Sequence, residues 1–271
     1  MQKLGLLFLL TASVALCQDA QPDRVTVPFS DPARPKSLHA SLINGGISVK
    51  GYDGKDAIVE ARPQGDSGRR SRRPERSDGM RRIDIGGSGL VVEESDNVIT
   101  VGTRAINDNI ELTIQVPFNT SLKLHAVNGG DIVVDHIVGD VEINNTNGSA
   151  TATHISGAAV VHALNGKVLV SLDKVTADKP MSFSSLNGDI DVTLPGDVKA
   201  RAKLKTDNGA VYSDFEVAVD AASRQPLVEN RSGKGKYRVQ FDRAMYALIN
   251  GGGPEIQFTT FNGNIYLRKA K

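Results

Sequence analysis

Residues 158–170 read AAVVHALNGKVLV: a run with apolar residues at alternate positions, an Asn-Gly pair, and a second alternating run. Four more copies of this pattern flank it along the chain. Their first halves read SLKLHAVNG (121–129), DVEINNTNG (140–148), PMSFSSLNG (180–188) and ARAKLKTDNG (200–209). The Asn residues of the five copies are spaced 19, 18, 22 and 21 residues apart, so the sequence predicts stacked structural repeats.

Apolar residues keep the same position relative to the Asn in every copy. Four residues before the Asn stand Leu124, Ile143, Val161, Phe183 and Leu204. Alternate apolar positions are typical of strands that turn one face toward a core. We therefore expect these five side chains to form one buried column. Aromatic residues make up only 5% of the chain and Trp is absent, which favours a core of thin aliphatic layers.

The Asn-Gly pairs are predicted to be corners between strands. The predicted corner residues are Asn44, Asn128, Asn147, Asn165, Asn187, Asn208 and Asn262. We expect backbone geometry to require the pair, because glycine accepts positive φ freely and asparagine tolerates it. Asn-Gly is also the strongest short signal for a β-hairpin. We favour an all-β, single-domain β-solenoid over a meander of hairpins, because stacked coils would superpose the Asn side chains into a ladder.

The N-terminus has the features of an export signal. Residues 1–17, MQKLGLLFLLTASVALC, combine one Lys, a short apolar run and small residues, and are predicted to be a secretory signal peptide. The mature protein is then expected to be extracytoplasmic: periplasmic, secreted or surface-associated. Cys17, the only cysteine, is either the last signal residue or the lipid-modified first residue of a lipoprotein. Leu16 is unlike the small residue that precedes a lipidated cysteine, which favours cleavage before Gln18.

The remainder is predicted to be a polar, proline-rich tether over 18–37 and one domain over 38–271. Asn44 lies 84 residues before Asn128, which is four periods of 21, so the strands between them are expected to continue the coil in degenerate form. Asn262 repeats the pattern in full, and the wider corner at Asn250 beside it is typical of an end-coil, so the Asn262 repeat is expected at the end of the stack. The terminal lysines, Lys269 and Lys271, would suit a strand at an open edge.

An arginine-rich stretch, residues 62–82, interrupts the domain with eight Arg and three acids. So polar a segment cannot bury enough surface to fold, so it is predicted to be a disordered insertion. The alternative is a patch that binds a polyanion. Its arginines would be Arg69, Arg70, Arg72, Arg73, Arg76, Arg81 and Arg82. The net charge of the chain is +1, so any attraction to a polyanion must be local.

The histidines and acids give little sign of catalysis or metal binding. His125 and His162 are expected on the outward face two coils apart, too far for shared ligation, whereas His136 and His154 approach each other near the second corner of adjacent coils. A histidine pair without a third ligand is a poor metal site. Acids at the corners lack the calcium-binding nonapeptide pattern. The candidate acids are Asp131, Asp140, Asp189 and Asp191. We therefore expect no catalytic residue, metal or cofactor.

Several motifs together resemble the bacterial putative adhesin family. They are Val116-Pro117 before the first regular repeat, Leu194-Pro195-Gly196, Thr206-Asp207-Asn208-Gly209, and the closing GGGP and FNGNI segments at 251–254 and 261–265. The resemblance covers roughly residues 38–268. It implies an extracytoplasmic β-solenoid and an adhesion role, and it supplies no catalytic residues. The arginine-rich stretch departs from the usual pattern of the family.

Three functions remain open from the sequence. The first is a non-enzymatic adhesin-like module of the cell envelope or surface that binds a polymer or a partner along one face of the solenoid. The second is an envelope regulatory or scaffolding module that docks another protein. The third is a carbohydrate-active β-helix enzyme. The first is favoured because the sequence offers a long repetitive surface and no cluster of catalytic groups.

Overall fold

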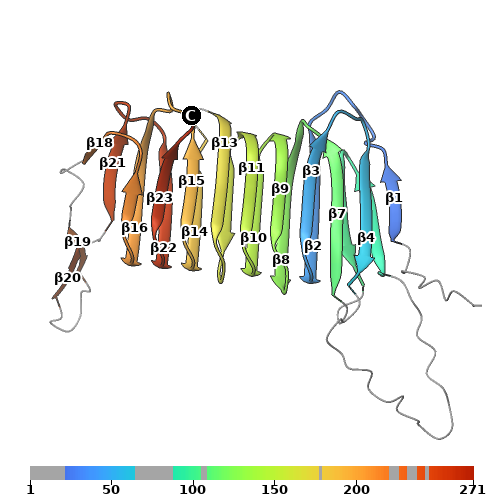
Figure 1. Cartoon of the computed structure of the whole chain (residues 1–271), viewed down its shortest axis with the longest axis horizontal. Coiled ribbons are helices and arrows are strands. Elements are labelled where there is room, and N and C mark those ends of the chain that lie inside the picture. The colour runs from blue at the N-terminus through green and yellow to red at the C-terminus, as the bar shows by residue number, and fades with distance from the viewer. Residues whose placement is uncertain are drawn as a thin grey trace, which may run out of the picture.

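The structure, a computed structural model, describes residues 22–64, 88–104, 109–176, 179–219, 226–230, 237–241 and 244–271, with the backbone alone at 226–230 and 237–241. These residues form two large, mostly parallel β-sheets and one small antiparallel pair, and none of them is helical (Figure 1). The predicted all-β class is therefore confirmed.

Sheet A contains ten strands. In spatial order they are β1 (Asp23–Val27), β4 (Ala57–Pro63), β7 (Ile110–Pro117), β3 (Ile47–Tyr52), β9 (Ile132–Val138), β11 (Ala150–Gly157), β13 (Val168–Val175), β15 (Ile190–Leu194), β23 (Ile265–Lys269) and β17 (Val211–Ser213).

Sheet B contains eleven strands and lies behind sheet A in Figure 1. In spatial order they are β18 (Val217–Val219), β21 (Met245–Ile249), β16 (Ala200–Asn208), β22 (Glu255–Asn262), β14 (Met181–Asn187), β12 (Ala159–Ala163), β10 (Val141–Asn147), β8 (Thr120–Asn128), β2 (Lys36–Asn44), β6 (Val98–Thr103) and β5 (Leu90–Ser95). The small pair is β19 (Pro226–Asn230) with β20 (Tyr237–Phe241).

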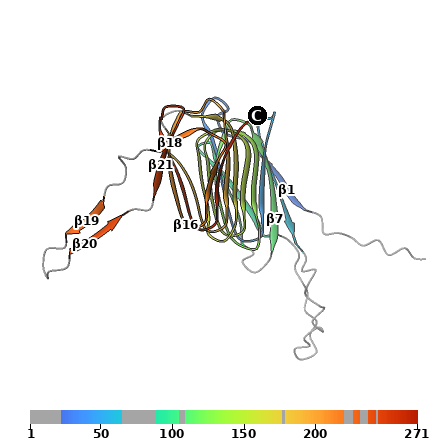
Figure 2. The same cartoon turned by 60° about the vertical axis from the view of Figure 1, so that its left-hand side comes forward.

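Each repeat contributes one strand to each sheet. The chain runs along β8 in sheet B, turns at Asn128, and runs along β9 in sheet A before it returns to sheet B as β10. Neighbouring strands from different repeats are parallel and in register, so Val141 pairs with Leu122 and Ala150 pairs with Ile132. In Figure 2 the repeats overlap as a row of flattened loops. The core lies between the two sheets.

The predicted column of apolar side chains is buried and longer than expected. Its members, in spatial order, are Ala40, Leu124, Ile143, Val161, Phe183, Phe258 and Leu204. All seven are at most 2% exposed, and the rings of Phe183 and Phe258 lie 5.3 Å apart. The strand register predicted from the sequence is therefore confirmed at these positions.

The order of the repeats in space differs from their order in the sequence at two places. First, the Asn44 repeat lies directly beside the Asn128 repeat, because β2 pairs with β8 and β3 pairs with β9. The expectation that intervening strands continue the stack between them is wrong. Instead β6 and β7 extend the two sheets on the far side of the Asn44 repeat. Antiparallel β4 and β5 then pair with β7 and β6.

Second, the C-terminal repeat lies inside the stack. Strand β22 pairs with β14 on one side and β16 on the other, and β23 lies between β15 and β17. The expectation that Asn262 belongs to an end-coil is wrong, and the C-terminus lies within the row, near β15, and not at its end (Figure 1). At this end of the molecule the outer strands of sheet B are β21 and β18, which pair antiparallel.

Close packing, more than a positive φ, requires glycine at the corners. A Cβ added to Gly148 would lie 2.1 Å from the carbonyl oxygen of Gly130, and one added to Gly166 would lie 2.2 Å from that of Gly148. Neither of these glycines has a positive φ, and no corner Asn has one. The expectation that the Asn-Gly pair is demanded by positive φ is therefore wrong at most corners. It holds at Gly45 and Gly129, whose φ values are 121° and 81°.

Residues 22–36, within the predicted tether, pack against the body. Strand β1 pairs antiparallel with β4, and Phe29 belongs to the core. The predicted signal peptide with Cys17, and all of the arginine-rich stretch beyond Gln64, lie outside the described residues. In the part of the chain that the structure describes, no helix has the length and apolar character needed to cross a membrane.

Candidate functional site

The predicted corner asparagines lie side by side along one edge of the molecule. Their side-chain amides form a continuous ladder of hydrogen bonds of 2.8–3.0 Å. Each Nδ2 donates to the next Oδ1 in the order Asn208, Asn262, Asn187, Asn165, Asn147 and Asn128. Asn44 is the register partner of Asn128 at the end of this row. The asparagines thus bond to one another.

The acids that follow the corner glycines bond to the backbone of the next repeat. The Ser149 amide donates to Asp131 at 2.7 Å, and the Asn264 amide donates to Asp189 at 2.8 Å. Asp191 forms a pair of hydrogen bonds with the guanidinium of Arg268. These carboxylates serve as links between repeats, which explains why acids occur at corners.

The predicted polyanion-binding arginines, Arg69 to Arg82, lie outside the described residues. Arg62, at the end of β4, is described, and its guanidinium pairs with Glu60 at 2.6 Å. His125 and His162 lie on the outer face of sheet B with Asn144 between them, two strands apart as predicted. His162 also contacts the Ser184 hydroxyl through Nδ1 at 2.8 Å.

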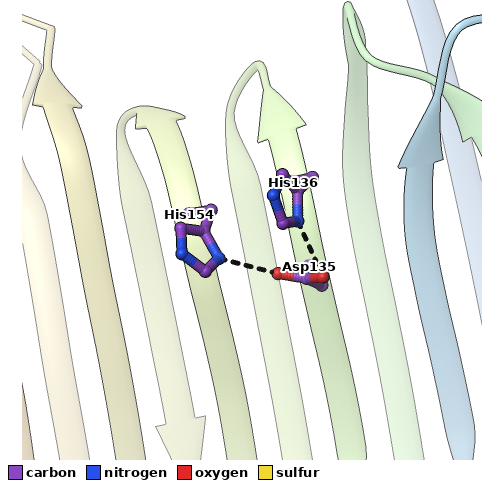
Figure 3. A group of neighbouring side chains, drawn as sticks. All are labelled: Asp135, His136 and His154. Atoms are coloured by element: carbon purple, nitrogen blue, oxygen red, sulfur yellow. Dashed lines mark hydrogen bonds and ion pairs between the residues drawn. The ribbon is translucent and has the colours of Figure 1, made fainter.

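His136 and His154 form a cluster with Asp135 on the outer face of sheet A (Figure 3). Nδ1 of His136 lies 2.7 Å from Oδ2 of Asp135, and Nδ1 of His154 lies 2.9 Å from Oδ1. The two imidazole rings stack with centroids 4.4 Å apart. Thr153 donates its hydroxyl proton to the same carboxylate at 3.0 Å. The carboxylate is therefore fixed by three side chains.

A β-bulge positions both histidines. In β9 and β11 two residues, and not one, separate the buried side chains, and the second of the two is histidine. His136 and His154 both have left-handed backbones, with φ of 57° and 54°. A bulge inserts one residue and re-aims side chains at the surface. The pairing of β11 with β13 is shifted here, since β13 has no such extra residue between Val170 and Leu172.

The charges of the cluster favour an ionised carboxylate. Burial raises the pKa of Asp135, but hydrogen bonds from His154, His136 and Thr153 outweigh burial and lower the pKa to about 2. The hydrogen bond to Asp135 raises the pKa of His154, and the nearby Asp173 carboxylate acts in the same direction. An acid fixed between two exposed imidazoles offers oxygen and nitrogen lone pairs to a ligand from solvent.

A groove of about 340 Å³ lies on the outer face of sheet B. Charged groups from several repeats line it, and its two carboxylates are paired: Lys179 lies 2.6 Å from Asp140, and Lys123 lies 3.3 Å from Glu142. His39 and Val160 also contribute to the lining. The groove thus brings acids and bases together, but each carboxylate already has a lysine partner.

A row of exposed and half-buried side chains follows the Asn ladder on its sheet B side. We name this set the corner row; it comprises the residue before each corner Asn. Its members, in spatial order, are Ile43, Val127, Thr146, Leu164, Leu186, Phe261 and Asp207. Ile43, Leu186 and Phe261 are 46%, 41% and 47% exposed. The corner row therefore presents exposed apolar side chains at Ile43 and at the adjacent Leu186 and Phe261, whereas Val127, Thr146 and Leu164 between them are half-buried.

Sequence reasoning missed Asp135 as the third member of the histidine cluster and missed the corner row. A signal for the first was present: Asp135-His136 and Thr153-His154 each break the alternation by placing two polar residues between apolar ones. A signal for the second was the recurrence of large apolar residues directly before Asn, where the alternation predicts an outward side chain.

No protein-family model matches this chain, and no curated protein matches it. It is similar to a solved structure described as a putative cell adhesion protein from Clostridium sporogenes ATCC 15579, at 13% identity and a TM-score of 0.43, over 92% of this chain and 100% of that one. A second similar structure is a putative adhesin from Bacteroides fragilis NCTC 9343, at 11% identity and a TM-score of 0.31, over 92% and 97%. Both solved structures are of bacterial proteins that are described as adhesion proteins or adhesins.

Proposed function

We propose that this chain is a non-enzymatic, exported, adhesin-like binding module of the bacterial cell envelope or surface. In this proposal the repeats are the coils of one β-solenoid, and the corner row holds a partner protein of the envelope. The export step is proposed from residues 1–17, whose composition is that of a signal peptide.

The observation that carries the proposal is the alignment of exposed apolar side chains in the corner row. Single exposed apolar residues are common on any protein, but contiguous ones mark interaction sites. Leu186 and Phe261 belong to neighbouring parallel strands, because Asn187 and Asn262 pair. Neighbouring strands lie about 4.8 Å apart, so their side chains form one surface.

The chemistry of the corner row favours a protein over a carbohydrate or a nucleic acid. Leucine, isoleucine and valine bury well against other apolar side chains. Phe261 is the one aromatic residue of the row, whereas single-stranded nucleic acid is bound by a series of stacking aromatic side chains along a positively charged groove. The non-enzymatic part of the proposal is supported by the groove on sheet B, where Asp140 and Glu142 are each paired with a lysine. Catalysis by carboxylates needs a group free to donate or accept a proton.

A binding experiment with matched variants tests the proposal. The purified protein is titrated with solubilised envelope proteins of the source bacterium on a sensor surface, and the response of Leu186→Ser/Phe261→Ser is compared with the wild type. We expect the double variant to bind at least about tenfold more weakly, which is what the loss of about 1.4 kcal/mol implies.

The control removes the same kind of side chain elsewhere. Val133 and Leu169 lie on the outer face of sheet A and are 39% and 44% exposed. The variant Val133→Ser/Leu169→Ser should bind like the wild type. Equal losses of binding affinity in both double variants would contradict a protein partner at the corner row. So would binding of a purified polysaccharide that neither double variant weakens. Turnover of a polysaccharide would restore the enzyme interpretation.

A further inference from the structure

We propose that Asp135, His136 and His154 form a binding site for one divalent metal ion of the zinc class. The ion would lie on the outer face of sheet A, between β9 and β11. This inference rests on the geometry of the cluster and is independent of the corner row and its partner.

The ligand atoms are already gathered. One atom from each of the three side chains lies within 4.8 Å of the other two. The contacts of 2.7 and 2.9 Å between the Asp135 oxygens and the two Nδ1 atoms are hydrogen-bond lengths. Ligands at about 2.0–2.2 Å from a tetrahedral Zn²⁺ ion lie roughly 3.3 Å from one another. To hold an ion, the two contacts between Asp135 and the imidazoles must therefore lengthen by about half an ångström.

The donor set selects the class of ion. Two imidazole nitrogens and one carboxylate oxygen suit Zn²⁺, Co²⁺, Ni²⁺ or Cu²⁺, whereas Ca²⁺ and Mg²⁺ prefer a shell of oxygen atoms alone. The side chains of His136 and His154 are 50% and 54% exposed, which leaves the solvent side open for water molecules to complete the coordination. The site would thus hold its ion with three protein ligands, each imidazole binding as the neutral base after its Nδ1 proton moves to Nε2 or to solvent.

The local backbone is shaped for this cluster. Left-handed conformations at non-glycine residues cost energy and gather at functional sites. Both histidines adopt one, in two consecutive repeats, while the next repeat in β13 omits the extra residue. On the other side, a Cβ at Gly51 would lie 1.8 Å from the carbonyl oxygen of His136, so the neighbouring strand makes room for the bulge. The stacking of repeats does not itself require these bulges.

Thr153 supports the carboxylate from a second position. Its hydroxyl lies 3.0 Å from Oδ1 of Asp135 and 3.4 Å from the carbonyl oxygen of Val134. Such outer hydrogen bonds orient metal ligands and contribute to affinity. The hydroxyl therefore limits the rotation of the Asp135 side chain before an ion arrives.

The test is a calorimetric titration of the purified protein, without a histidine tag and after treatment with a chelator, with ZnCl₂. We expect saturable uptake of one Zn²⁺ per chain and no heat of binding with MgCl₂ or CaCl₂. The variants His154→Asn and Asp135→Asn should each weaken Zn²⁺ binding more than about tenfold. Asparagine is chosen at position 154 because it tolerates the left-handed backbone.

The matched control is His125→Asn, an exposed histidine on the outer face of sheet B, which should bind Zn²⁺ like the wild type. A second readout does not depend on how the variants fold. Co²⁺ bound by the wild-type protein should give visible d–d absorption bands, and an equimolar amount of Zn²⁺ should remove them. Failure of the wild type to bind either ion, or His154→Asn binding as tightly as the wild type, would overturn the proposal.

Discussion

Each corner residue joins neighbouring repeats through contacts that only its own chemistry allows. The Asn amide both donates and accepts within the ladder, as between Asn165 and Asn147. At the glycine after it, the space that a Cβ would occupy is filled by a backbone carbonyl group of the adjacent repeat. Inside the corner, Ser185 and Thr260 donate their hydroxyl protons to the carbonyl oxygens of Gly166 and Gly188 at 3.0 Å. Backbone groups at the corner are satisfied in this way.

A pair of glycine substitutions separates the two roles that glycine has here. Gly166→Asn should lower stability by about 1–3 kcal/mol, since its side chain meets backbone 2.2 Å away. Gly129→Asn should cost much less, because Gly129 has no atom within 4 Å of the added Cβ and asparagine tolerates its positive φ. Chemical denaturation of both variants provides the measurement. A larger loss of stability from Gly129→Asn than from Gly166→Asn would mean that the positive φ, and not packing, requires glycine.

Glu94 provides a test of pH dependence. Hydrogen bonds from Ser30 lower the pKa of this carboxyl, partial desolvation opposes them, and the Asn97 amide adds to the lowering. A carboxyl whose pKa is lower in the folded state stabilises the fold above its unfolded pKa, and this contribution is lost as the pH falls through the folded pKa.

We therefore expect Glu94→Gln to be less stable than the wild type near pH 7, with the difference shrinking as the pH falls through the acid range in which Glu94 becomes protonated. Thermal unfolding of the two proteins across this range measures it. A difference that is constant with pH would show that the ionised carboxylate does not hold residues 30 and 94 together.

Strands were the part of this fold that the sequence revealed best. Alternation placed Leu124 and Phe183 in one column, and the recurrence of Asn at fixed offsets identified the corners. The bulges in β9 and β11 were harder to foresee, because a single extra residue shifts the alternation without ending the strand. For the same reason the third member of the cluster, Asp135, was not assigned from the sequence.

At the level of one strand, burial predicts how β14 responds to mutation. Phe183→Ala should destabilise the protein by about 3–5 kcal/mol, the range for a fully buried phenylalanine. Ser182→Ala, one residue earlier and on the outer face, should change stability by less than about 0.5 kcal/mol. Denaturant midpoints of the two variants compare them directly. Similar losses from both would contradict the register of this strand.

The order of the repeats is a property of the whole molecule that periodicity does not encode. All repeats share one register, so any two of them can lie side by side, and sequence distance is a poor guide to neighbours. The C-terminal repeat fits beside β14 because Phe258 packs on Phe183 and Asn262 continues the Asn ladder. The Asn44 repeat is a neighbour of the Asn128 repeat although 84 residues separate the two asparagines.

Disulfide trapping tests this order in a Cys17→Ser background, since Cys17 is the only cysteine. The pair Leu186→Cys/Phe261→Cys places thiols on adjacent strands and should oxidise rapidly. The cysteines of Leu186→Cys/Asp207→Cys lie on β14 and β16, which have β22 between them. They should not form a disulfide within one chain. Electrophoresis without reductant separates the products. Preferential bridging of positions 186 and 207 would restore the sequential order of repeats.

Photo-cross-linking in living cells tests most directly whether the corner row is the binding surface. A photoreactive amino acid replaces Leu186 in one strain and Leu169 in another, since both are exposed apolar residues of similar accessibility on different surfaces. Irradiation of cells that produce the protein should join it to one partner protein through position 186 and not through position 169. Cross-links from position 169 alone, or from neither position, would contradict a partner held at the corner row.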